Sequence, residues 1–475
     1  MNSTLFATPS PCSSPARFIS NLFRGVLVVG LVCFFCGVMS PVLAENITYR
    51  GSSGDLQDMP AYFSGGGKNT LAPAGYTSII NNTIIIDYLS GTDPENVWGG
   101  YSSRGNVMNN RVILQNGKVK ELRGGYSDNG SVTNNMVSVS GGSVRAWVYG
   151  GDSVSGNVTG NAVTISRGTV HYVRGGHSVS GAATNNTVTI SGGTMNGVVY
   201  GGLSYESNAT GNTVTISGGI ANDTVYGGRG NRGRVTNNTV SISGGIVRGG
   251  VSGGDSRGSV TNNTVSVSGG IVNGTVSGGN SISGTATGNT VTISGGTVYG
   301  GVDGGFSMHN SATANTVTLK NASVGRKIVG GVGARKAGAA TGNTVTLAGE
   351  ITFILSTDIL GGRDASVSNN TLNLIDFRQM GAGRVGRVSN FDRLHFSGLK
   401  ADQARAILTA ANVNLDNSRT TLLFDGKPGT VRLIEAASLH MVNARIDPVE
   451  YGGVRYGFHW DSEGNAVVGN SGVGE

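Results

Sequence analysis

One eight-residue phrase recurs along most of the chain and constrains its fold more than any other feature of the sequence. Its clearest copy, residues 186–193, reads Asn-Thr-Val-Thr-Ile-Ser-Gly-Gly. A second phrase, Val-x-Gly-Gly, lies between the copies, for example at residues 148–151, 225–228 and 276–279. The Asn of the first phrase recurs every 25 to 28 residues, at Asn82, Asn110, Asn135, Asn161, Asn186, Asn212, Asn238, Asn263, Asn289, Asn315, Asn343 and Asn370. Units of this size cannot each bury a core alone, so we expect them to stack on one another.

Residues within each copy alternate with a period of two, which is typical of β-strands. Val188 and Ile190 therefore point to one side of the strand, and Thr187 and Thr189 point to the other. Aligning the copies places like residues in three inward columns. The columns are Val137, Val163, Val188, Val214, Val240, Val265, Val291 and Val317; Val139, Ile165, Ile190, Ile216, Ile242, Val267, Ile293 and Leu319; and Val97, Leu122, Val148, Val173, Val199, Val225, Val251, Val276, Val302 and Ile328.

Columns with one like residue per unit predict stacked parallel strands whose hydrogen bonds run along the long axis. We therefore predict an all-β protein, a parallel β-helix (β-solenoid) of about twelve turns of 25–28 residues over residues 79–375. Each turn should contain about three short strands separated by Gly-rich corners, where positive φ costs little. Composition agrees, because 81 Gly with only 9 Pro exclude collagen, and 37% hydrophobic residues argue against disorder.

The recurring Asn has a defined orientation. By parity, Asn186 faces the same side as Val188 and Ile190, which is the interior. A buried amide must be hydrogen-bonded, and a stack of amides is satisfied if each bonds to the next and to the backbone of its turn. We predict an asparagine ladder that fixes the corner and the register, and we consider a row of ligand-binding or catalytic amides the weaker hypothesis. The ladder includes Asn135, Asn161, Asn186, Asn212, Asn238, Asn263, Asn289 and Asn315.

Residues 1–44 have the features of an extended secretion signal. Arg17 and Arg24 form its positive region, and residues 25–39 are almost entirely apolar. Val42-Leu43-Ala44 then supplies the small residues of a cleavage site. An uncleaved transmembrane anchor is the alternative, and Pro41 together with the small-residue site argues for cleavage. We therefore expect an exported protein.

The cysteines and the charge bound what the exported chain can do. Cys12, Cys33 and Cys36 all lie in the leader, so the mature chain would hold no disulfide and no thiolate metal site. Removing the two leader arginines lowers the net charge from +7 to +5. Spread over about 430 residues, this charge is too weak to indicate nucleic-acid binding.

The ends of the mature chain differ from the repeats. We assign residues 45–78 to an N-terminal cap and residues 376–475 to a mixed, β-rich C-terminal capping segment. The C-terminal segment has fewer Gly, and we predict a helix over residues 401–411. A cap is expected because an uncovered strand edge invites aggregation.

One outward column differs from the Thr, Ser and Gly that cover most of the predicted surface. Aromatic rings and guanidinium groups spaced by about 4.8 Å can stack on one another. They can also present a strip to sugars or to a protein surface. Ladder packing is the favoured interpretation, and the strip is our candidate binding site. The column runs Trp98, Arg123, Tyr149, Arg174, Tyr200 and Tyr226, and then continues as Ser252 and Ser277.

The repeats offer little for catalysis. Glycan-cleaving β-helix enzymes need two carboxylates close together on one outward face. Asp152 and Asp255 share a repeat position, but four turns of roughly 4.8 Å separate them. His171 and His177 have no evident third partner for a metal ion. The acidic residues of the repeats are isolated in sequence: Asp128, Asp152, Glu206, Asp223, Asp255 and Asp303.

A second catalytic pattern is also weak. Residues 151–153 and 254–256 both read Gly-Asp-Ser, which resembles the nucleophile motif of serine proteases. Ser recurs at this corner in most turns while the residue before it varies, so we interpret the motif as a product of the repeat. We predict no catalytic residue, no metal ligand and no cofactor.

The chain resembles the passenger regions of Gram-negative autotransporters. The resemblance rests on Gly-Asn-Thr-Val-Thr-Ile-Ser-Gly-Gly, on Val-Tyr-Gly-Gly, on Gly-x-Ala-Thr between turns and on the extended leader. Residues 386–396 and 451–458 resemble the segment that precedes the translocator barrel. Family members end in an outer-membrane barrel, whereas this sequence ends at Glu475 without such strands. A truncated product, use of another chain's barrel and a periplasmic protein all stay open.

The resemblance implies a structural or adhesive surface rod without catalytic activity. It implies an outer-membrane translocator as partner and a host-surface glycan or protein as target. It also implies a location in the periplasm, at the outer membrane and cell surface, or outside a Gram-negative cell. A glycan-acting β-helix enzyme, a polysaccharide lyase or hydrolase, is the alternative. Two carboxylates within about 10 Å in the folded protein would favour the enzyme.

Overall fold

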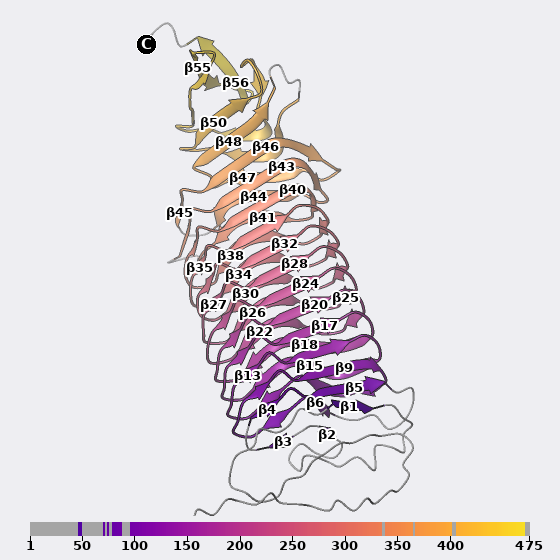
Figure 1. Cartoon of the computed structure of the whole chain (residues 1–475). Coiled ribbons are helices and arrows are strands. Elements are labelled where there is room, and N and C mark those ends of the chain that lie inside the picture. Colours follow the sequence, from indigo (N-terminus) through magenta and orange to yellow (C-terminus); the bar gives the residue numbers. More distant parts are fainter. Residues whose placement is uncertain are drawn as a thin grey trace, which may run out of the picture. The chain divides into compact units, whose positions relative to one another are not determined.

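The computed structural model describes residues 46–49, 70–71, 74–75, 78–87, 96–334, 338–363, 366–400 and 405–470. The predicted signal peptide, its cysteines and most of the predicted N-terminal cap lie outside these residues. The described chain is all-β, without a helix, and forms a parallel β-solenoid of about 14 turns (Figure 1). The predicted fold class is therefore confirmed, and the twelve predicted turns are close to the observed number.

A typical turn contains four strands, one more than predicted. It consists of β20 (Thr187–Ile190), β21 (Thr194–Met195), β22 (Val199–Ser204) and β23 (Ala209–Thr210). The extra strand is β23, the Ala-Thr pair of the phrase Gly-x-Ala-Thr that lies between the predicted strands. Its two residues suffice for a strand because Ala209 is buried while Thr210 is partly exposed, and the pair hydrogen-bonds to the turns on either side.

Equivalent strands of successive turns pair in parallel and form four stacks. The first stack is β1 (Asn46–Tyr49), β5 (Thr83–Asp87), β9 (Arg111–Asn116), β14 (Met136–Val139), β17 (Ala162–Ile165), β20, β24 (Thr213–Ile216), β28 (Thr239–Ile242), β32 (Thr264–Val267), β36 (Thr290–Ile293), β40 (Thr316–Val324), β43 (Thr344–Phe353), β46 (Thr371–Met380), β48 (Arg393–Leu399), β50 (Arg419–Phe424) and β53 (Arg445–Ile446). The second is β10 (Lys118–Val119), β21, β25 (Ile220–Ala221), β29 (Ile246–Val247), β33 (Ile271–Val272) and β37 (Thr297–Val298), and longer strands take its place in other turns.

The third stack carries the Val-x-Gly-Gly phrase. It contains β2 (Thr70–Leu71), β3 (Ala74–Gly75), β6 (Asn96–Trp98), β7 (Tyr101–Ser102), β11 (Glu121–Arg123), β12 (Tyr126–Ser127), β15 (Ser143–Ser153), β18 (Thr169–Ser178), β22, β26 (Val225–Gly230), β30 (Val251–Ser256), β34 (Val276–Ser281), β38 (Val302–Ser307), β41 (Lys327–Val332), β44 (Thr357–Arg363), β47 (Val385–Ser389), β49 (Leu408–Asn414) and β52 (Ile434–His440).

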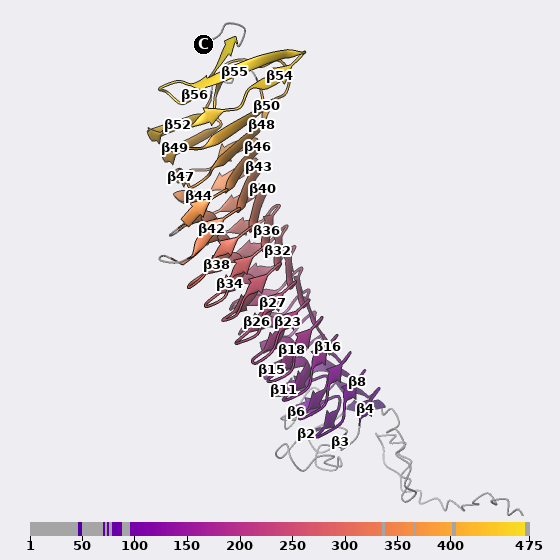
Figure 2. The ribbon, with the colours of Figure 1, turned by 90° about the vertical axis from the view of Figure 1, so that its left-hand side faces the viewer.

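The fourth stack is a separate 12-stranded sheet, several strands of which follow one another in Figure 2. It contains β4 (Ile79–Ile80), β8 (Val107–Met108), β13 (Val132–Thr133), β16 (Val158–Thr159), β19 (Ala183–Thr184), β23, β27 (Val235–Thr236), β31 (Val260–Thr261), β35 (Ala286–Thr287), β39 (Ala312–Thr313), β42 (Ala339–Thr341) and β45 (Ser366–Ser368).

The core confirms the three predicted inward columns. Val188 pairs in register with Val163 of the turn before and Val214 of the turn after, and all three are fully buried. Ile190 and Val199 are fully buried too, while Thr187 and Thr189 are partly exposed on the outer face. Burial of each such Val or Ile side chain stabilises the folded state by roughly 1.5–3 kcal/mol. The columns form one continuous hydrophobic cluster along the solenoid.

The asparagine ladder is also present. Asn186 Nδ2 donates to Asn212 Oδ1 at 3.0 Å, and the backbone N of Asn186 donates to the same oxygen at 2.9 Å. The second Nδ2 hydrogen of Asn186 goes to the carbonyl of Val158 at 3.0 Å. The residue before each ladder Asn has positive φ in most turns, for example 54° at Asn185, which is why the sequence reads Asn-Asn or Gly-Asn there. The ladder thus provides hydrogen-bond partners for the buried backbone and amide groups at this corner.

The C-terminal segment departs from the sequence-based expectations in two respects. Parallel pairing continues past residue 375 as far as β53, and only the last strands form an antiparallel sheet of β51 (Val431–Arg432), β56 (Asn465–Asn470), β55 (Val454–Trp460) and β54 (Val449–Tyr451).

The helix predicted over residues 401–411 is wrong wherever the segment is described. Residues 408–411 belong to β49, which pairs with β47 and β52, while residues 401–404 lie outside the described part. Leu408, Ala410 and Val413 of β49 pack into the solenoid core, so tertiary stacking overrides the helix propensity of this Ala-rich stretch. Within the residues that the structure describes, no helix is long and apolar enough to cross a membrane.

Candidate functional site

The Gly-Gly pair of the third stack brings two outward columns together. In a regular strand, residues three positions apart point to opposite faces. Here they meet, since Ser277 Oγ donates to Asn280 Oδ1 at 2.7 Å and the rings of Trp98 and Tyr101 lie 5.8 Å apart. The strand therefore bends at Gly-Gly and directs both flanking side chains to the same outer side.

Both glycines of the bend are required by close packing. A Cβ on Gly253 would lie 2.5 Å from the carbonyl oxygen of Gly278 in the next turn. A Cβ on Gly254 would lie 2.7 Å from Nδ2 of the ladder residue Asn263. The Gly-Gly phrase thus exists because one glycine faces the neighbouring backbone and the other faces the asparagine ladder.

We call the two columns the Trp98 column and the Tyr101 column. The Trp98 column contains the predicted site residues Trp98, Arg123, Tyr149, Arg174, Tyr200 and Tyr226 in register, followed by Ser252 and Ser277. The Tyr101 column contains Tyr101, Tyr126, Asp152, His177, Leu203, Arg229, Asp255 and Asn280. Only the first column was predicted from the sequence, although the second has the same repeat spacing.

The Trp98 column stacks as predicted but is less exposed than predicted. Tyr200 and Tyr226 stack with centroids 5.3 Å apart and an interplanar angle of 10°. Trp98, Tyr149, Arg174 and Tyr200 are only 6–8% exposed. The Tyr101 column covers them from across the Gly-Gly bend. The column therefore offers edges and limited faces to solvent instead of a row of projecting rings.

Arg123 is held by both rings and acids. Its Cζ lies 4.3 Å from the ring centre of Tyr126, 4.9 Å from that of Trp98 and 5.0 Å from that of Tyr149. Its Nε contacts Glu121 at 2.6 Å, and Nη1 contacts Asp152 at 2.9 Å. Burial alone would lower the pKa of this guanidinium, but the two carboxylates raise it above its ordinary value. Arg123 is thus ion-paired with two acids of the fold, although its Nε, like that of Arg174, is buried without a hydrogen-bond partner.

Asp152 is not the isolated carboxylate that the sequence suggests. It accepts from Arg123 and also contacts Nδ1 of His177 at 2.6 Å, within the Tyr101 column. Burial alone would raise the pKa of Asp152, but Arg123 and His177 together hold it below its ordinary value. Asp152 is therefore ionised over a wide pH range and serves as an acceptor between turns.

Arg174 has a similar aromatic environment but a different set of polar partners. Its Cζ lies 4.0 Å from the ring centre of Trp147, 5.4 Å from that of Tyr149 and 5.7 Å from that of Tyr200. Its Nε is buried without a hydrogen-bond partner, and its charge is one of those that lower the pKa of Asp152. Trp147 was not predicted as part of this site, because β15 pairs with β18 through an irregular register between Val144 and Trp147.

Two further carboxylates lie farther along the columns. Asp255 contacts Arg229 at 3.3 Å, and Asp303, which follows Ser277 in the Trp98 column, contacts Lys327 at 3.0 Å. Burial raises the pKa of both carboxyls, and the paired cation offsets this only in part. Each acid is thus matched with one base from a neighbouring turn.

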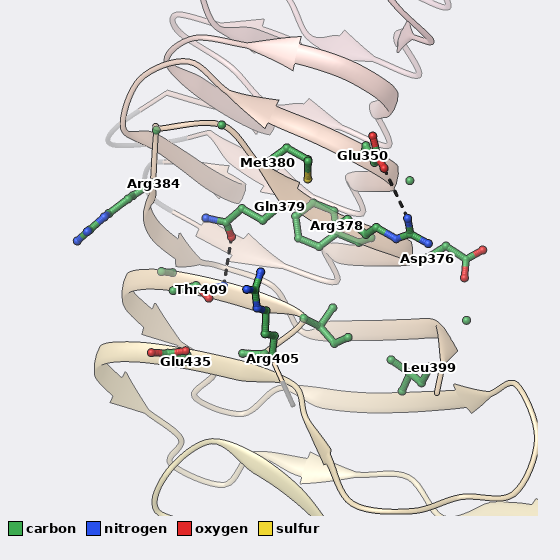
Figure 3. A pocket seen from close by; sticks show the side chains of 18 of the residues that line it. Glu350, Asp376, Arg378, Gln379, Met380, Arg384, Leu399, Arg405, Thr409 and Glu435 are labelled. Carbon is green, nitrogen blue, oxygen red and sulfur yellow. Dashed lines mark hydrogen bonds and ion pairs between the residues drawn. The ribbon is translucent and has the colours of Figure 1, made fainter. Parts of the chain in front are cut away.

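A hollow that was not predicted lies in the C-terminal region (Figure 3). It has a volume of about 2050 Å³ and lies beside the second half of β46, where the turn after that strand is short. Glu350 and Arg378 face each other across 3.5 Å, and the backbone N of Thr409 donates to Gln379 Oε1 at 3.2 Å. Its charged side chains are of both signs and mostly exposed.

Comparison with known proteins adds no family. The chain matches no known protein-family model, and no curated protein is significantly similar to it in sequence. Among the described residues, no three His, Cys, Asp or Glu side chains gather closely enough to hold a metal ion. What the structure itself defines is a parallel β-solenoid with a paired aromatic and ionic column on its outer face.

Proposed function

We propose that this protein is an exported, autotransporter-type passenger that acts as a structural and adhesive surface rod without chemistry of its own. The observation that carries the proposal is that many buried polar groups of the solenoid bond from one turn to the next. Asn186 and its equivalents bind one another, and Arg123 joins Glu121 to Asp152. Such contacts stabilise a long, cysteine-free stack, which an exported rod requires.

The proposal includes the location and the partners. The extended leader supports export, and the resemblance to autotransporter passengers supports an outer-membrane translocator as partner. A host-surface glycan or protein is the proposed adhesive target. The paired columns support adhesion because Trp, Tyr and Arg dominate interface energies, and the rest of the repeat surface consists largely of Thr, Ser and Gly.

Two measurements test the proposal. Fractionation of a Gram-negative host should place the processed chain in the periplasm or, with a translocator supplied, at the cell surface. Cells displaying it should adhere better than cells without it, and changing Tyr149, Tyr200 and Tyr226 together to Ser should reduce adhesion. Tyr299→Ser, at a ring 47% exposed outside the columns, is the matched control. A cytoplasmic, unprocessed chain, or display without adhesion, would contradict the proposal.

A glycan-acting enzyme is the second candidate, and one observation favours it. Glu121 and Asp152 both contact Arg123, so they lie closer than the roughly 10 Å that two catalytic carboxylates span. Arg123 occupies the position between them, however, and the lowered pKa of Asp152 makes it a poor proton donor. Release of reducing or unsaturated ends from polysaccharides, abolished by Asp152→Asn, would establish this function in place of the rod.

A further inference from the structure

We infer that Arg174 binds the carboxylate or sulfate group of an acidic polysaccharide, with the neighbouring aromatic rings packing against the sugar. This inference deepens the proposed adhesive function, and its biological role rests on that function. Arg123 and Arg174, two arginines of one column, differ in their acidic partners.

The two arginines share an aromatic setting and differ in their acceptors. Each guanidinium lies near three rings, at 4.3–5.0 Å for Arg123 and 4.0–5.7 Å for Arg174. Arg123 has two carboxylates within 3 Å, whereas the described residues give Arg174 none. Asp152, an acid of the adjacent turn, is already bonded to Arg123 and His177. Arg174 therefore feels the charge of Asp152 but has no carboxylate in salt-bridge contact among the described residues.

The terminal nitrogens of Arg174 are the donors that the oxygen atoms of a ligand can reach. Arg174 is 8% exposed, and its Nε is buried without a partner. Nε is the one guanidinium nitrogen of Arg174 that is both buried and unpartnered, so the two terminal nitrogens keep contact with solvent. The planar fork matches a carboxylate or a sulfate, which can accept two parallel hydrogen bonds. The rings hold the guanidinium in place, so little conformational entropy remains to be lost on binding.

The rings beside Arg174 supply the contact for a sugar. Trp147 and Tyr172 are half-buried, and their rings stack with centroids 4.2 Å apart at 22°. A Cβ on Gly197 in the next turn would collide with the ring of Tyr172, so this stack covers the glycine backbone and spans three turns. A flat apolar surface next to a fixed charge is the arrangement that accommodates the C–H face of a pyranose and its acidic substituent.

The test uses the purified full-length chain and three polymers. Polygalacturonate carries only carboxylates, dextran sulfate carries only sulfates, and dextran is neutral. Binding is measured by biolayer interferometry at fixed salt, because charge contacts depend on ionic strength. We expect binding to at least one acidic polymer and none to dextran. The polymer that binds identifies the acidic group, and equal binding of dextran would overturn the inference.

Matched variants separate the site from general charge. Arg174→Gln should weaken binding by about tenfold or more, which corresponds to about 1.4 kcal/mol. Arg167→Gln removes the same charge from an exposed position of the same turn and should leave binding within about twofold. Equal losses for both variants would refute a specific site. Arg174→Lys, which keeps the charge and loses the planar fork, should bind several-fold more weakly than the wild type.

Folding and function are kept apart by two further readouts. Trp147→Ala removes a half-buried ring and leaves the guanidinium, so a loss of binding with unchanged circular dichroism supports the site even if Arg174→Gln unfolds. Unchanged binding by Trp147→Ala and Arg174→Lys together would overturn the inference. If cells displaying the chain adhere although the purified chain binds neither acidic polymer, the inferred Arg174 site is refuted and the proposed adhesive function is not. If the purified chain binds an acidic polymer but cells displaying it do not adhere, the proposed adhesive function is refuted and the Arg174 site is not.

Discussion

Replacing Asn212 by Leu tests the asparagine ladder in the middle of the solenoid. Asn212 Oδ1 accepts from the backbone N of Asn186 at 2.9 Å and from its Nδ2 at 3.0 Å. Asn212 Nδ2 donates to the carbonyl of Ala183 at 2.9 Å and to Asn238 Oδ1 at 2.9 Å. All of these groups are buried, so the variant removes four hydrogen bonds that water cannot replace.

The expected cost follows from which groups keep another partner. Asn186 Nδ2 still donates to Val158, and Asn238 Oδ1 still accepts from the backbone N of residue 212. The backbone N of Asn186 and the carbonyl of Ala183 lose the contact that Asn212 made. At about 1–3 kcal/mol for each of these two unsatisfied buried groups, we expect a loss of about 2–6 kcal/mol. The larger Leu must also fit against Gly202, which packs on Asn212.

Urea unfolding of the purified chain measures this loss, with the free energy taken from the midpoint and the slope. Asn196→Leu is the control, because the side chain of Asn196 is exposed and accepts one hydrogen bond, from Asn222 Nδ2. We expect the control to lie within about 0.5 kcal/mol of the wild type. Equal stabilities of Asn212→Leu and Asn196→Leu would show that the ladder contributes nothing beyond its packing.

Three further predictions follow from single positions. Ala314 has a φ of 55°, so Ala314→Gly should stabilise the chain by up to about 1 kcal/mol in urea unfolding, and a loss of stability would show that this backbone is not strained. In Gly279→Ala the new Cβ would lie 2.7 Å from Oδ1 of Asn289, so we expect a cost of about 1–3 kcal/mol, and a neutral result would contradict the close packing. Burial raises the pKa of Asp303, so the folded state binds this proton more tightly than the unfolded chain does. The protein therefore loses stability as pH rises from the unfolded pKa of Asp303 towards its folded pKa. Burial alone would do the same to Asp152, but Arg123 and His177 lower its pKa, so its contribution is lost as pH falls. Asp303→Asn and Asp152→Asn should therefore change the pH dependence of stability in opposite directions in the acidic range, and parallel profiles would refute both assignments.

The repeat made the interior of this protein predictable. A period of 25 to 28 residues combined with strict alternation decides which residues of each turn face inward. Val188, Ile190 and Val199 are buried as predicted, and Asn186 bonds to its neighbours as predicted. The register of the stack can be predicted without the angle between the strands of one turn, because equivalent residues of successive turns lie above one another in any parallel solenoid.

The C-terminal segment shows where local propensity fails. The Ala-rich stretch that ends at Ala411 has the composition of a helix, but residues from Leu408 onward stack on β47 and continue the solenoid. A turn already formed offers unpaired backbone groups along its whole length. Pairing with them and burying Leu408 and Val413 outweighs the small preference of Ala for a helix.

The outer columns depended on the tertiary structure. The sequence by itself determined that Trp98, Arg123, Tyr149, Arg174, Tyr200 and Tyr226 would form one column, because their spacing follows the repeat. Only the bend at Gly-Gly decided that the Tyr101 column would lie against them, bury them and give Arg123 an acid that Arg174 lacks. The reason is geometric: a residue's place along the axis is set by the period, whereas contacts around the axis are set by the angles at the corners, and these depend on how the backbone packs against the asparagine ladder and the next turn.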